Sequence, residues 1–106
     1  MPLTTIPIMN RSDLISAIRA HEAALKAEGI AHLALFGSRA RGDANIESDV
    51  DVLIEIAPER RFSLLNLSGV GLLIEDATGL RSQVVLRRSI PSEFAERIKN
   101  DLVPVF

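Results

Sequence analysis

Two aspartates one residue apart, Asp49 and Asp51, are the residues of this sequence best suited to chemistry. They lie in the stretch DVDVLIEI, whose alternation of residue types predicts a strand. Side chains at alternate strand positions leave the same face, about 6 to 7 Å apart at the backbone. Two such carboxylates can hold a hard cation such as Mg²⁺, which also relieves their mutual repulsion. A solvated polar strand face is the plainer alternative, although aspartate is depleted in strand interiors.

A glycine-serine turn with two arginines precedes the aspartates, in the stretch GSRARG. Gly37 ends an apolar segment, and Ser38 begins a short helical turn that Gly42 closes. Backbone N–H groups and the hydroxyl of such a turn can bind an anion, and the guanidinium groups of Arg39 and Arg41 suit phosphate oxygens. Solvated arginines in an ordinary connection are the alternative. Turn and aspartates together predict a site for a nucleoside triphosphate with Mg²⁺.

The elements that must position these residues follow from periodicity and from turn residues. Strand 49–56 should bury Val50, Val52, Ile54 and Ile56 on one face, which leaves the aspartates on the other. The predicted order is α-β-β-α-β-α, an α/β (α+β) fold in which helices pack on a small mixed sheet. The expected elements are a helix over 13–28, a strand over 30–36, the strand over 49–56, a helix over 63–77, a strand over 82–87 and a last helix starting at Pro91.

Composition restricts the class of protein. The chain has 106 residues, 47% of them hydrophobic and 25% charged, which predicts a single domain over residues 1–106 with a real core. Twelve basic and fourteen acidic residues give a net charge of -2, which counts against nucleic acid as the main partner. Cysteine is absent, and neither a signal peptide nor a membrane-spanning stretch is recognisable. We therefore expect a cytoplasmic protein with no membrane association.

The stretch GSRARGDANIESDVDVLIEI resembles the signature of the minimal nucleotidyltransferase family, which belongs to the polymerase-β-type nucleotidyltransferase superfamily. The family pattern is GSxARGxxxxxSDxD. This resemblance implies the nucleotidyltransferase fold. The matching residues are Gly37, Ser38, Ala40, Arg41, Gly42, Ser48, Asp49 and Asp51.

The resemblance also implies an activity, the transfer of AMP from ATP to an acceptor. Asp49 and Asp51 would be the catalytic residues and would hold two Mg²⁺ ions. The nucleotide-binding residues would be Gly37 and Ser38 on the outer phosphates, with Arg39 and Arg41 as further phosphate contacts. Stand-alone members this small are similar to antitoxins that silence a HEPN-type ribonuclease toxin by binding it and by adenylylating a tyrosine. A HEPN-type toxin is therefore the expected partner, and self-association stays open.

One departure from the family concerns a third carboxylate, expected on the later strand. The stretch SQVV places Gln83 there, and an amide cannot act as a general base. Glu55 lies about 13 Å from Asp51 along the strand, too far to replace it, whereas Glu75 and Asp76 stay open. A degenerate transferase that neutralises its partner by binding alone is the alternative. A transferase acting on RNA ends or on an antibiotic fits less well, because this small chain has no basic excess and no added substrate-binding structure.

Overall fold

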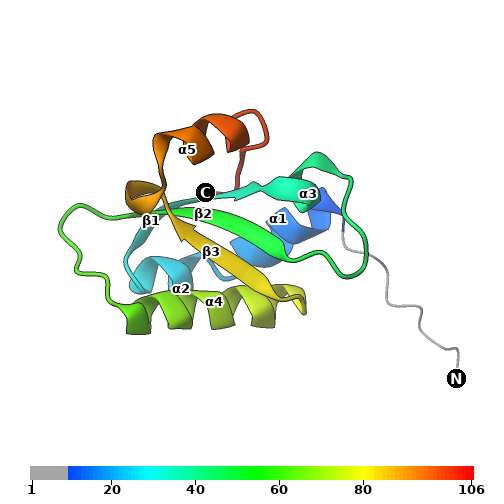
Figure 1. Cartoon of the computed structure of the whole chain (residues 1–106). Helices are drawn as coiled ribbons and strands as arrows, with labels where there is room; N and C mark the ends of the chain where they lie inside the picture. The colour runs from blue at the N-terminus through cyan, green and yellow to red at the C-terminus, as the bar shows by residue number, and fades with distance from the viewer. Residues whose placement is uncertain (1–9) are drawn as a thin grey trace, which may run out of the picture.

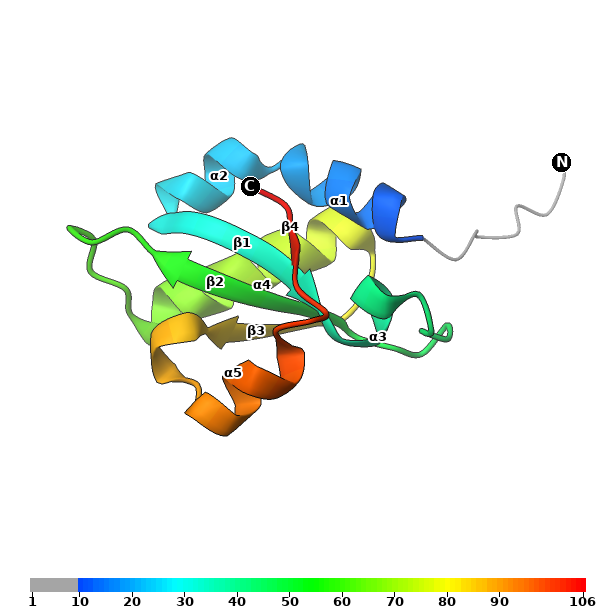
Figure 2. The same ribbon diagram turned by 90° about the horizontal axis from the view of Figure 1, so that it is seen from above.

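The computed structural model describes residues 10–106, which form a four-stranded mixed sheet between helices (Figures 1 and 2). Among these residues no helix is long and apolar enough to cross a bilayer. The elements are α1 (Arg11–Arg19), α2 (Glu22–Ala27), β1 (Ile30–Phe36), α3 (Gly37–Arg41), β2 (Val50–Ile56), α4 (Leu64–Thr78), β3 (Ser82–Leu86), the 3₁₀ turn η1 (Arg87–Ser89), α5 (Ser92–Ile98) and β4 (Val103–Pro104).

The strands lie in the order β3-β2-β1-β4. β2 runs antiparallel to β1, β1 runs antiparallel to β4, and β2 runs parallel to β3. The parallel pair requires a crossover, which α4 supplies by packing on one face of the sheet. Both central strands therefore have neighbours on each side, and the pairing registers place their side chains.

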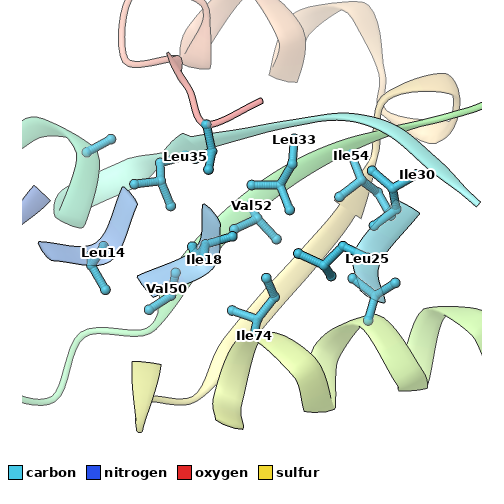
Figure 3. Packing of buried hydrophobic residues seen from close by; sticks show 13 residues of the cluster. Leu14, Ile18, Leu25, Ile30, Leu33, Leu35, Val50, Val52, Ile54 and Ile74 are labelled. Atoms are coloured by element: carbon cyan, nitrogen blue, oxygen red, sulfur yellow. The ribbon is translucent and has the colours of Figure 1, made fainter. Parts of the chain in front are cut away.

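The face of the sheet that carries α1, α2 and α4 holds the main core (Figure 3). Val50, Val52 and Ile54 of β2 are fully buried there, as the sequence predicts, whereas Ile56 is only partly buried. Ser63 caps α4 by accepting the N–H of Asn66, which fulfils the expectation of a helix start at this serine. The other large buried side chains of this core are Leu14, Ile18, Leu25, Ile30, Leu33, Leu35, Val70, Ile74 and Val105.

The opposite face of the sheet is covered in part by α5. Phe36, Leu53 and Ile98 form a second buried cluster, and the rings of Phe36 and Phe94 meet edge to face with their centroids 5.8 Å apart. Ile98 and Phe94 are the residues of α5 that pack in this cluster. Leu53, on the same face as the aspartates, is therefore buried too, which the alternation of residue types along β2 does not reveal.

Two predicted elements need correction. The helix expected over 13–28 is two helices, because His21 leaves the helical region at φ -106° and ψ 14°. Ile18 and Leu25, on either side of this break, are both buried in the core. The strand β4 is absent from the predicted order, since two residues are too short to show periodicity. Its neighbour Val105 is nonetheless buried, and the N–H of Val105 donates to the Leu33 carbonyl at 2.8 Å.

Candidate active site

The register of the central strands brings three predicted site positions together. Asp51 of β2 is the Cα partner of Phe36 on β1, directly before the Gly37 turn, and of Gln83 on β3. Gly37 has φ +75°, and a Cβ placed on it would collide with Oδ2 of Asp51 and lie 3.2 Å from its Cγ. The carboxylate of Asp51 thus stands against the backbone of the turn, which is possible because residue 37 has no side chain.

The two aspartates differ in their surroundings. Asp49 lies just before β2, with Oδ1 3.5 Å from Nε of the exposed Arg81. Asp51 makes no ion pair with any residue in the described range. Burial raises the pKa of Asp51, the charge of Asp49 raises it further, and the charge of Arg41 opposes both. The pair is therefore electrostatically strained, and this strain is what a bound cation relieves.

These side chains suit a hard divalent cation, since both are carboxylates and the charge of Asp49 acts on Asp51. Among residues 10–106 there is no group of three or more His, Cys, Asp or Glu side chains that could hold a metal. A hollow of about 550 Å³ opens beside Asp49, between the loop after α3 and the turn before β3. It is lined by Ile46, Glu47, Ser48, Asp49, Gly79, Leu80 and Arg81.

The turn itself is the short helix α3, ended by Gly42 at φ +90°. The carbonyl oxygen of Ser38 accepts the N–H groups of Gly42 and Asp43, at 2.9 and 3.1 Å. Ser38 is half-buried in this turn. The sequence predicted this helical turn and its closing glycine, and α3 lies at the end of β1 where it was expected (Figure 2).

Arg39 is too buried to contact a phosphate, because only 3% of the residue is exposed. Its Nε and Nη2 donate to the carbonyl of Ser48 at 3.1 and 2.9 Å, and Nη2 also donates to the carbonyl of Asn45 at 3.1 Å. The guanidinium therefore ties down the loop that leads to Asp49. The structure places Arg39 in the support of the site and away from its open side.

Arg41, by contrast, is exposed beside the site. Its Nε contacts Asp43 at 3.0 Å and its Nη1 contacts Asp101 at 2.9 Å. The hydrogen bonds to Asp43 and Asp101 raise the pKa of Arg41, so the group stays charged. The contact between Asp101 and Arg41 cannot be predicted from the sequence, because sixty positions separate the two residues.

The position of the third carboxylate is occupied by Gln83, whose exposed side chain lies on the strand next to Asp51. Glu55 pairs with Arg87 at 3.6 Å, further along β2. Glu75 of α4 accepts hydrogen bonds from the N–H and the hydroxyl of Ser82. Asp76 belongs to the same helix, which packs on the face of the sheet opposite to the aspartates. Neither helix residue replaces the missing carboxylate.

Comparison with known proteins identifies the family. The model of the nucleotidyltransferase domain family matches residues 18–105. The chain belongs to this family. A relative, the protein adenylyltransferase MntA of Thermococcus cleftensis, is 30% identical over 99 residues, which cover 92% of this chain and 98% of the relative.

Solved structures support the nucleotidyltransferase fold. A structure described as a "putative minimal nucleotidyltransferase" is 27% identical, with a TM-score of 0.76 over 91% of this chain and 96% of that one. A toxin–antitoxin complex with AMP-PNP, at 16% identity, has a TM-score of 0.66 over 92% and 73% of the two chains, which supports the fold alone. The predicted family and fold class are thereby confirmed: this is a minimal nucleotidyltransferase with a mixed sheet.

Proposed function

We propose that this nucleotidyltransferase transfers AMP from ATP to a hydroxyl of a partner protein, as the antitoxin of a HEPN/MNT pair. The observation that carries the proposal is the contact between the Asp51 carboxylate and Gly37, which joins the acidic pair and the turn in one site. The name of the Thermococcus relative, a protein adenylyltransferase, supports ATP and a protein acceptor. ATP of the cytoplasm would be the donor.

Each residue then has a distinct task. Asp49 and Asp51 would hold Mg²⁺, which offsets phosphate charge when bound. The backbone at Gly37 and the Ser38 hydroxyl would bind the outer phosphates, with Arg41 beside them. Arg39 is assigned to the loop that positions Asp49. The acceptor oxygen forms a bond to the α-phosphorus, the bond to pyrophosphate breaks, and the acceptor proton passes to solvent because Gln83 cannot take it.

A HEPN-type toxin is the proposed partner. One solved complex contains a tri-AMPylated Shewanella oneidensis HEPN toxin with its MNT antitoxin; its antitoxin is 13% identical to this chain, with a TM-score of 0.61 over 87% of this chain and 71% of that one. This likeness shows the fold, and the HEPN toxin in that complex is the reason for proposing a partner of this kind.

The experiment uses the purified chain, ATP labelled at the α-phosphate, Mg²⁺ and, as the proposed partner, the HEPN-type protein that such a pair would encode beside it. We expect label on the partner with the wild-type chain, and none with Asp49→Ala or Asp51→Ala. Absence of label together with absence of nucleotide binding would contradict the proposal. Glu55→Ala is the matched control, because this acid lies on the same strand but pairs with Arg87.

The second candidate function is neutralisation by binding alone, and Gln83 favours it. A missing general base typically slows such chemistry by about 10² to 10⁴. Inhibition of the toxin without any label, together with labelling gained by Gln83→Asp, would establish this reading. Inhibition that requires ATP and is lost with Asp51→Ala would establish the transferase.

A further inference from the structure

The β3 side of the aspartate pair carries a cation and an amide where a third acid would be expected. The Val50 N–H donates to the carbonyl of Arg81 at 2.8 Å, and the parallel register continues with Asp51 opposite Gln83. Arg81 therefore lies beside Asp49, and Gln83 lies beside Asp51. Both are exposed, on the face of the sheet from which the aspartates project.

The charge of these four side chains limits how many cations they can hold. Two divalent ions 3.5 to 4 Å apart bring four positive charges, which need several anionic ligands. Besides the oxygens of the triphosphate, only Asp49 and Asp51 supply negative charge, and the guanidinium of Arg81 lies 3.5 Å from Asp49. The amide of Gln83 offers only a neutral oxygen. A second ion on the β3 side would meet a guanidinium and no additional carboxylate.

We propose that the site holds one divalent cation with the triphosphate, and that Arg81 supplies the positive charge on the β3 side in place of a second cation. This inference rests on the proposed function, since it describes the same nucleotide site. The side chain of Arg81 is 82% exposed, so its ion pair with Asp49 is worth little. Arg81 can therefore leave Asp49 to a metal ion and turn to a phosphate oxygen, for which a guanidinium is well suited.

The test counts Mn²⁺ ions per chain by electron paramagnetic resonance, in the presence of saturating α,β-methylene ATP. We expect one ion for the wild type and two for the double variant Arg81→Gln, Gln83→Asp, which restores the acid and removes the cation. We also expect Arg81→Gln alone to weaken the affinity for the analogue with Mn²⁺ about tenfold by calorimetry, through loss of a charge-assisted contact. Arg61→Gln, at an exposed arginine in the β2–α4 loop, is the matched control and should leave both measurements unchanged.

Two ions bound to the wild type would overturn the inference and leave the proposed function standing. Unchanged affinity in Arg81→Gln would overturn the role of the guanidinium, and a double variant that still binds one ion would overturn the role of these two positions. A wild type that binds no nucleotide would contradict the proposed function itself, and the inference with it. Thermal melts followed by circular dichroism establish that each variant is folded.

Discussion

At the scale of single residues, the site depends on the close approach of Asp51 to Gly37. The sequence predicts that both aspartates leave one face and that the turn lies nearby, and the registers place Asp51 at the turn. The sequence does not reveal which basic groups surround them. Arg81 could have been found from a parallel register with β2, whereas Asp101 depends on the path of the chain after α5.

Replacing Gly37 by alanine tests this approach. We expect Gly37→Ala to abolish nucleotide binding, because its Cβ would occupy the space of the Asp51 carboxylate. Gly79→Ala is the matched control: it has a similar φ of +70° but no atom within 4 Å of the added Cβ. Both variants should lose about 1 to 2 kcal/mol from backbone strain. Calorimetry with ATP should show binding for Gly79→Ala only, and equal affinity of the two variants would contradict this account.

Asp51 also makes stability depend on pH. Because burial and Asp49 raise its pKa in the folded state, the folded protein binds the proton more tightly than the unfolded chain. The resulting cost is absent below the ordinary pKa of 3.8 and develops as pH rises through the folded pKa. Asp51→Asn should therefore raise the Tm at pH 7, and raise it less near pH 4, as measured by scanning calorimetry without metal. A gain that does not shrink at low pH would contradict the assignment.

At the scale of elements, the loop between α3 and β2 is held from inside by one buried guanidinium. The motif makes Arg39 and Arg41 look equivalent, and periodicity cannot separate them, because α3 is little more than a turn. The structure assigns them opposite environments, one nearly buried and one exposed. The helix break at His21 was likewise hidden, since an apolar stripe continues on both sides of it.

Removal of each arginine should have a different effect. We expect Arg39→Ala to cost about 2 to 3 kcal/mol of unfolding free energy, because the carbonyls of Asn45 and Ser48 lose a charged donor. Arg41→Ala should change the unfolding free energy much less than Arg39→Ala does, since the ion pairs of Arg41 are exposed. Its main effect should be on ATP affinity. Urea denaturation and ATP titration of both variants check these expectations. An Arg39→Ala variant as stable as the wild type would disprove the role of Arg39 in holding the loop.

At the scale of the whole molecule, the C-terminal residues close the sheet against β1. The carbonyl of Val105 accepts Nε of Arg19 at 2.9 Å, so the chain end is joined to α1 as well. The segment LVPVF carries too little pattern to predict this closure, because its strand has only two residues. The order of the longer elements was predictable from their periodicity, whereas this closure depends on contacts between opposite ends of the chain.

Truncation of the buried Val105 side chain tests whether the C-terminal residues stabilise the fold. Val105→Ala should lower the unfolding free energy by about 2 kcal/mol, because this side chain is 1% exposed in the core. Pro104→Ala, at the exposed neighbour, should change it by less than about 0.5 kcal/mol. Urea midpoints give both values. Equal midpoints for the two variants would show that the last residues contribute nothing to the core.

The solvent-exposed leucines of α4 have a practical consequence. Leu64, Leu65 and Leu72 are 82%, 83% and 62% exposed, which gives an isolated copy of the chain an apolar surface through which it can aggregate. Concentrated preparations should scatter light on gentle warming, well before the interior melts. A second protein that covers these leucines would keep the chain in solution. The amount of soluble chain in a lysate should therefore be higher when the two proteins are expressed together than when the chain is expressed alone.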